Sequence, residues 1–209
     1  MPALTILAGP NGAGKTQLSQ SLLEQHFLSC SPINIDVLEN QIDVNKLPHD
    51  FLRYNKVRSK EIDKIFTSEC IHAIKNSQNF SHECNLRIDQ LRCVKLFEDA
   101  GYELNLIYIW LNNVVLSEKR VEQRVATGGH YVDLESIHLN YEEGLRNLYL
   151  SYNEWNNLYV FDNSKNFTCP TQTFSLFLYS EAGNIKYISP EFRNNVGVHN
   201  KLPRIFENI

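Results

Sequence analysis

A run of eight residues near the amino terminus has the types and the spacing of a phosphate-binding loop. It matches the pattern G-x-x-x-x-G-K-[ST] and reads Gly9-Pro10-Asn11-Gly12-Ala13-Gly14-Lys15-Thr16. Backbone N–H groups can converge on phosphate oxygens only where side chains leave room, as at Gly12 and Gly14. Lys15 can reach the outer phosphates, and the Thr16 hydroxyl is a hard oxygen ligand for Mg²⁺. We therefore expect ATP and Mg²⁺ to bind at Gly9, Pro10, Asn11, Gly12, Ala13, Gly14, Lys15, Thr16 and Gln17.

Two acidic residues close short segments that read as strands. Asp36 follows residues 33–35, and Glu83 lies near the end of residues 79–84. Phosphoryl transfer to an alcohol needs a carboxylate near the γ-phosphate to accept the proton, and Asp36 is the first candidate for this base. Glu83 is the second acid, as a clamp on the acceptor or through a water on the metal. In the alternative interpretation, Asp36 caps a helix and Glu83 is a solvated loop acid.

Arg120 and Arg124 are one helical turn apart and therefore share a helix face. Cations that arrive when a site closes can stabilise the charge on a transferred phosphoryl group. The segment Thr127-Gly128-Gly129 that follows can act as a hinge, which predicts a helical lid. The alternative is a surface helix whose arginines pair with Glu118 and Glu122.

The elements that must position these residues alternate along the chain. Apolar runs predict strands at residues 3–8, 33–35, 79–84, 103–110 and 158–161. Apolar residues at three- and four-residue steps predict helices at residues 17–27, 51–78, 86–100, 114–126 and 134–156. Gly101 and Asp133 are expected to cap two of them. The predicted fold is a three-layer α/β fold of the P-loop kinase type, with a mainly parallel five-stranded sheet that binds ligands beyond the carboxyl ends of its strands.

The pattern changes after Pro170. Residues 174–179 and 185–188 flank a turn-like segment and predict a β-hairpin. The polar, proline-containing residues 194–209 are expected to be poorly ordered. We expect a nucleotide-binding domain over residues 1–170 and a hairpin extension over residues 171–209 that packs on it.

Composition argues against several other classes of protein. Twenty basic and twenty-four acidic side chains give a net charge of −4, without a basic run that would bind a row of phosphates. The five cysteines lack metal-ligand spacing and are expected to be reduced thiols. No apolar stretch is long enough to span a bilayer. We expect a cytoplasmic protein that does not bind nucleic acid in general.

Several segments together resemble the zeta-toxin-like P-loop kinases, and among them the small bacterial ATPases related to zeta toxin. The resemblance covers roughly residues 4–165, and the Gly-Gly-His element after two Arg-Val pairs is its most specific part. The matching segments are residues 6–16, 34–36, 83–86, 100–102, 120–121, 124–125, 128–130, 144–148 and 161–164.

The resemblance implies roles for named residues. Asp36 would be the base, and Arg120 and Arg124 would hold the γ-phosphate from the lid. The residues expected to contact the acceptor are Glu83, Asn85, Arg87 and His130. In characterised relatives the acceptor is a UDP-linked amino sugar, which makes that class the leading candidate, and a small antitoxin restrains the kinase.

The sequence departs from the family pattern at three places. Cys84 replaces a threonine after Glu83, Val132-Asp133-Leu134 replaces Val-Pro-Glu, and Asn140 replaces a lid arginine. Arg146 or Arg124 is expected to cover the loss of that cation. Two alternatives to a small-molecule kinase therefore stay open. One is an ATPase-only or non-catalytic nucleotide switch that regulates a protein partner, and the other is a nucleic-acid end kinase.

Overall fold

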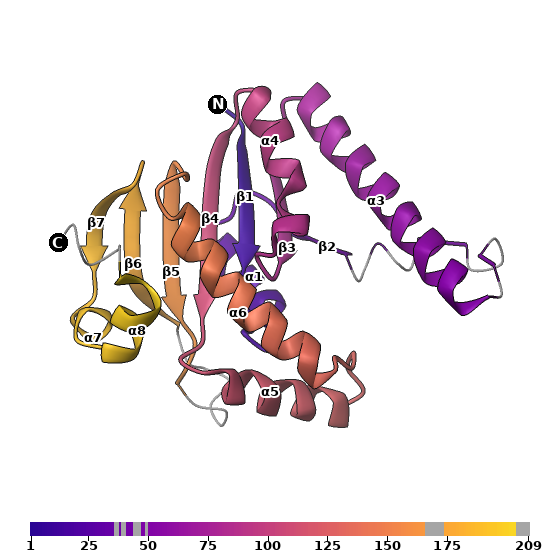
Figure 1. Cartoon of the computed structure of the whole chain (residues 1–209). Helices are drawn as coiled ribbons and strands as arrows, with labels where there is room; N and C mark the ends of the chain where they lie inside the picture. Colours follow the sequence, from indigo (N-terminus) through magenta and orange to yellow (C-terminus); the bar gives the residue numbers. More distant parts are fainter. Residues whose placement is uncertain (36–37, 39–40, 44–46, 49, 166–173, 204–209) are drawn as a thin grey trace.

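The computed structural model describes residues 1–35, 38, 41–43, 47–48, 50–165 and 174–203 (Figure 1). The described strands form one seven-stranded sheet in the order β2-β3-β1-β4-β5-β6-β7. The first five strands pair in parallel, and β6 and β7 pair antiparallel. The strands are β1 Ala3–Ala8, β2 Ile33–Asn34, β3 Phe80–Cys84, β4 Glu103–Trp110, β5 Asn157–Asp162, β6 Ser175–Glu181 and β7 Asn184–Ile188.

This sheet confirms the predicted α/β fold and corrects its strand count. The hairpin after residue 174 was expected as an extension on the domain, whereas β6 pairs directly with β5 and continues the same sheet. Its ladder runs from Asn157 opposite Glu181 to Asp162 opposite Ser175. Because the edge of β5 is paired in this way, the five predicted strands and the hairpin share one set of hydrogen bonds.

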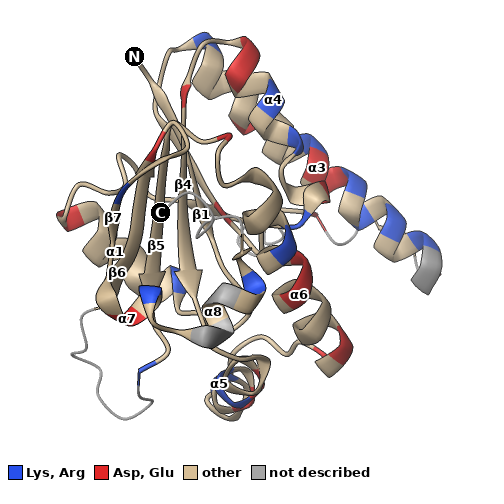
Figure 2. Cartoon of the chain, turned by 60° about the vertical axis from the view of Figure 1, so that its left-hand side comes forward, with Lys and Arg blue, Asp and Glu red and all other residues tan. Residues whose placement is uncertain are grey.

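Helices cover both faces of the sheet. In Figure 1, α1 lies on one face, and α4 and α6 lie on the other; the turned view in Figure 2 agrees. The described helical elements are α1 Lys15–Glu24, α3 Phe51–Lys75, η2 Ile88–Gln90, α4 Arg92–Asp99, α5 Val114–Ala126, α6 Leu134–Ser151, α7 Pro190–Arg193 and α8 Val196–Lys201.

The predicted helices differ from the observed ones mainly at their ends. The helix expected at residues 86–100 is divided into the short 3-10 turn η2 and α4, and the one expected at residues 134–156 ends at Ser151. Asp133 caps α6 as predicted, because its side chain accepts from the backbone N–H of Ser136. Gly101 has the predicted left-handed backbone, with φ 77°.

The carboxyl-terminal segment is more ordered than its composition suggested. Residues 196–201 form α8, and Val198 and Leu202 are buried. The expectation of poor order is therefore wrong for residues 194–203, because apolar burial fixes them against the sheet. Across the described ranges, no helix combines the length and the apolar character that a membrane span requires.

The core lies between the sheet and its helical layers. Leu4, Ile6 and Leu7 of β1 and Leu106 and Ile107 of β4 are fully buried. Continuous burial is expected of parallel strands that are covered on both faces. It fixes the end of β1, and therefore the loop that follows it, against β3 on one side and β4 on the other.

Candidate functional site

The segment between β1 and α1 is a tight loop that ends at the first residue of a helix. Its glycines Gly9, Gly12 and Gly14 have positive φ, and α1 begins at Lys15. The helix therefore points its amino-terminal end at the inside of the loop, where its partial positive charge favours an anion.

All three glycines are required by close neighbours as well as by the backbone angle. A Cβ atom at Gly9 would lie 2.6 Å from the carbonyl oxygen of Ile109. A Cβ atom at Gly12 would lie 2.9 Å from Cβ of Arg120 and 3.1 Å from the carbonyl oxygen of Ser117. A Cβ atom at Gly14 would lie 2.8 Å from Nδ2 of Asn163. The loop thus has the small, hydrogen-only lining that a phosphate cradle needs.

Side chains from other elements hold the carbonyl oxygens of the loop. Ser117 donates to the Asn11 carbonyl, Arg120 donates to the Gly12 carbonyl at 3.2 Å, and Asn163 donates to the Ala13 carbonyl at 2.8 Å. These contacts neutralise part of the negative charge of the carbonyl groups, which would otherwise repel a phosphate. Neither Ser117 nor Asn163 was among the predicted site residues, because both act through distant backbone groups.

Lys15 connects the loop to the end of β3. Its Nζ atom donates to the carbonyl oxygens of Gly9 and Pro10 at 2.8 and 3.2 Å, and to Oδ1 of Asn85 at 3.1 Å. The side chain is buried. Lys15 and Asn85, separated by about 70 positions in the sequence, therefore meet at one point of the site.

Thr16 and Glu83 form the second contact between the loop and β3. The Thr16 hydroxyl donates to both carboxylate oxygens of Glu83, at 3.1 and 2.8 Å. The sheet explains this proximity, because Glu83 lies opposite Leu7, directly before the loop. A hydroxyl and a carboxylate are the hard oxygen donors that suit Mg²⁺.

This pair needs further oxygen donors to complete a magnesium site. Among the described residues, no group of three or more His, Cys, Asp or Glu side chains could hold a metal ion. Magnesium usually keeps several waters and is bound through one or two protein groups together with the substrate phosphates. The Thr16–Glu83 pair fits that pattern.

The predicted base Asp36 lies outside the described residues. The end of β2 is nevertheless described, since Asn34 pairs opposite Glu83. The chain therefore leaves β2 at the level of the Thr16–Glu83 contact. The acid at the end of β5, Asp162, is buried and accepts from the backbone N–H of Ser164 at 2.9 Å.

The two predicted lid arginines make different contacts. Arg120 is partly buried and also donates to the carbonyl of Asn163 at 2.7 Å. Burial lowers the pKa of Arg120 from its ordinary value, and the charge of Asp162 opposes that shift. Arg124 instead donates to the carbonyl of His130 at 2.8 Å, in the turn between α5 and α6. The structure thus brings Arg120 to the loop, and it joins Arg124 and His130 to each other.

A contact between Glu118 and His138 joins the two helices of the predicted lid. Glu118 contacts His138 of α6, with Oε1 and Nε2 2.5 Å apart. This contact joins α5 to α6. The predicted lid is therefore one unit of two helices connected at Glu118 and at the Arg124–His130 turn.

Two of the positions at which the sequence departs from the family pattern have a structural explanation. Cys84 is buried, and its sulfur accepts from the backbone N–H of Leu86 at 3.3 Å. Burial raises the pKa of this thiol to about 12, so it stays neutral in the core. Asn140 is also buried, and its Nδ2 atom donates to Oδ1 of Asn11 at 2.8 Å. The amide at position 140 therefore contacts the phosphate loop directly.

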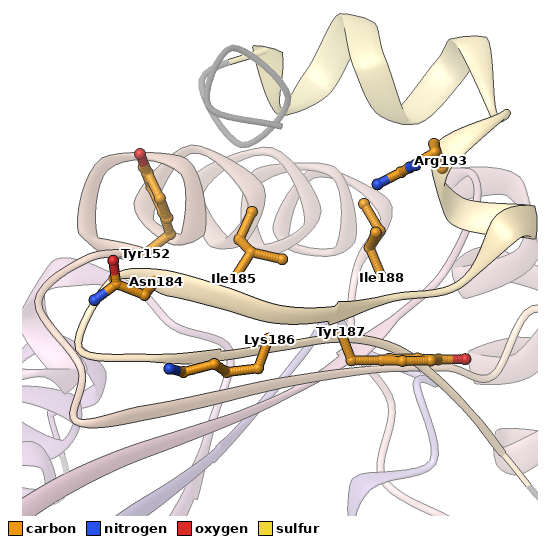
Figure 3. Close-up of a pocket in the computed structure, with 8 residues that line it drawn as sticks. Tyr152, Asn184, Ile185, Lys186, Tyr187, Ile188 and Arg193 are labelled. Carbon is orange, nitrogen blue, oxygen red and sulfur yellow. The ribbon is translucent and has the colours of Figure 1, made fainter.

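Two of the cavities in the described part of the chain have different surroundings. One, of about 440 Å³, lies along β7 (Figure 3). The other, of about 400 Å³, lies between α3 and the η2–α4 segment and includes Ile35 and Gln90. Gln90 also accepts from the backbone N–H of Asn85, so the second cavity adjoins the Lys15–Asn85 contact. The smaller cavity is therefore the one of the two that adjoins this contact, and none of the predicted site residues lines it.

The fold of this chain is similar to that of several solved structures. A chain of the PezAT chromosomal toxin–antitoxin system of Streptococcus pneumoniae is 17% identical, with TM-score 0.59, over 100% of this chain and 80% of that chain. The complex of AvrRxo1-ORF1 with ORF2, solved with ATP, gives 14% identity and TM-score 0.63 over 97% of this chain and 63% of that chain. At these identities, the likeness establishes the fold.

The sequence comparison is more specific than the fold comparison. No curated protein matches this chain. The zeta toxin family, in contrast, matches residues 1–168, which is most of the chain and includes the phosphate loop, Glu83 and both arginines of α5. The chain therefore belongs to the zeta toxin family and has the fold of a P-loop nucleotide-binding kinase.

Proposed function

We propose that this protein transfers the γ-phosphoryl group of ATP to a hydroxyl group of a small molecule. The observation that carries the proposal is the Thr16–Glu83 contact beside the glycine-lined loop. It brings a metal-binding hydroxyl and a carboxylate to the outer end of a phosphate cradle. A UDP-linked amino sugar is the leading acceptor class, on the strength of the family resemblance alone.

Each residue would have a defined task in the transfer. The loop and Lys15 bind the phosphates, and Arg120 holds the loop in the shape that binds them. Mg²⁺, when bound at Thr16 and Glu83, would neutralise charge on the outer phosphates. Asp36 would accept the proton of the acceptor hydroxyl as its oxygen bonds to the γ-phosphorus, the bond to the bridging oxygen breaks and ADP leaves.

The acceptor would bind in the 400 Å³ cavity beside Gln90. Its size suits a small molecule. The lining combines the apolar side chains of Ile62, Phe66 and Leu96 with polar and charged ones, among them Ser59 and Asp63. Such a mixed lining suits a ligand with an apolar face and several hydroxyl groups.

The net charge of −4 speaks against the nucleic-acid alternative. In Figure 2, the basic residues of α3, the helix that borders this cavity, gather in its amino-terminal half, and acidic residues follow farther along the helix. Strand binding would instead require a continuous basic track along the backbone of the nucleic acid.

A nucleotide-dependent switch is the second candidate function, and Asn140 favours it. A neutral amide contacts Asn11 where the family pattern has an arginine. In this case ATP would bind and order the α5–α6 unit for a protein partner, without transfer to a small molecule. A regulatory protein is a partner that we propose for either function, since the PezAT neighbour is a toxin–antitoxin system.

The test uses labelled ATP and a metabolite extract, with the product identified by mass. The parental protein is expected to label one small molecule. Asp36→Asn should keep its affinity for Mg·ATP and lose transfer, whereas Lys15→Ala should lose nucleotide affinity. Asp99→Asn, on the exposed face of α4, is the matched control and should behave as the parent. Transfer at the parental rate by Asp36→Asn would exclude this base.

A second variant tests the position of the acceptor. Ser59→Trp would fill the cavity without contact to the loop, so transfer should fall while Mg·ATP affinity stays the same. Lys60→Trp places the same side chain on an exposed neighbouring position of α3 and should have no effect. Equal transfer by the two variants would mean that the acceptor binds elsewhere.

A further inference from the structure

Asn140 of α6 is part of a polar chain that connects the phosphate loop to the segment after β3. Its side chain is 8% exposed. Nδ2 donates to Oδ1 of Asn11, and Oδ1 accepts from Nη1 of Arg87 at 3.5 Å. A guanidinium group is thus held one side chain away from the loop.

Arg87 belongs to the same turn that contacts Lys15. The backbone N–H groups of Asn85 and Arg87 both donate to Oε1 of Gln90, at 2.9 and 3.2 Å. Asn85 in turn accepts from Nζ of Lys15. The outer phosphates that Lys15 would reach therefore lie on the side of the loop where Arg87 is anchored.

Helix α6 fixes this turn closely against the site. A Cβ atom at Gly144 would lie 2.6 Å from the carbonyl oxygen of Asn85, so the glycine allows the helix to approach. Asn147 donates to the carbonyl of Leu86 at 2.7 Å. The backbone from which Arg87 extends is thus held from both sides, and its guanidinium is the part that can reorient.

The ion pairs of Arg87 leave its charge available to a phosphate. Nε lies 3.2 Å from Asp89 and 3.4 Å from Glu143, and all three side chains are partly exposed to solvent. Solvent-screened pairs of this kind contribute little free energy, whereas a bidentate contact between arginine and phosphate is among the strongest in proteins. A terminal phosphate can therefore compete for Arg87.

We propose that Arg87 binds the terminal phosphoryl group of ATP and stabilises its charge during transfer, and that Asn140 positions Arg87 for this contact. Arg87 thus acts on the donor nucleotide rather than on the acceptor, which is the role that the family resemblance implied. Arg124 is engaged at His130, and Arg146 lies on the exposed face of α6. This inference rests on the proposed nucleotide site.

The test compares the affinities of the protein for Mg·ATP and Mg·ADP, and it needs no knowledge of the acceptor. Arg87→Gln should weaken Mg·ATP binding by about tenfold or more, since one charge-assisted contact is lost. Its affinity for Mg·ADP should change less than about twofold, because ADP lacks the terminal group. Arg53→Gln, at an exposed position of α3, is the matched control, with parental affinity for both nucleotides.

A second pair of variants tests the role of Asn140. Asn140→Leu should lower the preference for ATP over ADP in the same direction as Arg87→Gln. The double variant Arg87→Gln with Asn140→Arg should regain part of that preference, because the cation returns from the neighbouring side chain. Thermal melting of every variant separates these effects from loss of fold.

Three outcomes would overturn the inference. They are parental binding of both nucleotides by Arg87→Gln, an equal loss of affinity for both, and a change only in the KM of the acceptor. Each result would remove Arg87 from the terminal phosphate. A parental protein that fails to bind Mg·ATP would instead overturn the proposed function itself. The two failures are therefore distinguishable by the parental measurement.

Discussion

At the scale of single residues, the phosphate loop is determined by contacts that no glycine motif specifies. The carbonyl groups of Asn11, Gly12 and Ala13 are each held by a side chain from another element. At Gly12, both the Arg120 side chain and the α5 backbone lie against the glycine. The loop and α5 therefore form one structural unit.

Substitution of Gly12 tests this close approach. Gly12 has φ 70° and Gly101 has φ 77°, but nothing lies within 4 Å of a Cβ atom at Gly101. Alanine at either position should lower the free energy of unfolding by about 1–2 kcal/mol through the left-handed backbone alone. Gly12→Ala should lose more stability than Gly101→Ala and should also bind Mg·ATP more weakly. Gly101→Ala should keep the parental affinity for Mg·ATP. Denaturant titration and nucleotide binding measure the two effects, and equal stability losses would contradict the packing argument.

At the scale of elements, helix α6 carries Asn140, Gly144 and Asn147 to the site, and its start depends on one cap. Asp133 accepts from the backbone N–H and from the hydroxyl of Ser136, at 2.8 and 2.7 Å. The hydrogen bond from the Ser136 N–H, and then that from its hydroxyl, hold the pKa of Asp133 below its ordinary value of 3.8. The ionised carboxylate is thus the form that stabilises the helix.

Removal of this cap should have an effect that depends on pH. Because the pKa of Asp133 is lowered by folding, its contribution is fully present above pH 3.8 and is lost as pH falls through the native pKa. Asp133→Ala should therefore lower Tm near neutral pH, and the difference from the parent should shrink below pH 3.8. Glu135→Ala removes a charge from the same helical turn and is the control. A difference that persists unchanged in acid would contradict the cap.

At the scale of the whole molecule, the carboxyl-terminal hairpin and its short helices complete the sheet and its core. Phe192 of α7 is fully buried, with ring centroids 5.8 Å from Trp110 and 5.0 Å from Phe177. Lys201 of α8 donates to the carbonyl of Asn112 and to the hydroxyl of Tyr141. These contacts reach β4 and α6, the elements that position the phosphate loop and its neighbours.

We therefore expect the predicted domain (residues 1–170) and the predicted extension (residues 171–209) to unfold together. Phe192→Ala should lower the free energy of unfolding by about 3–5 kcal/mol, as expected for a buried aromatic side chain, and thermal melting should still show a single transition. Tyr187→Ala, on the more exposed surface of β7, should change stability by less than about 0.5 kcal/mol. Two separate transitions would show instead that residues 171–209 form an independent unit.

The sequence by itself determined the features that depend on local pattern. The loop at residues 9–16, the strand and helix order, the α5 boundaries and the Asp133 cap all follow from spacing, turn chemistry and hydrophobic periodicity. The family resemblance added Asn85, Arg87 and His130. Such features can be read from the sequence because they involve residues that lie close together along the chain.

Only the tertiary structure decided which distant side chains meet. Ser117, Asn140 and Asn163 reach the loop from positions more than 100 residues away, through hydrogen bonds that sequence spacing does not encode. The same is true of Asn85, which parallel pairing of β3 with β1 brings to Lys15, and of the hairpin, which joins the sheet because β5 has an edge to pair. Strand order and helix packing set these contacts, and both depend on the folded core as a whole.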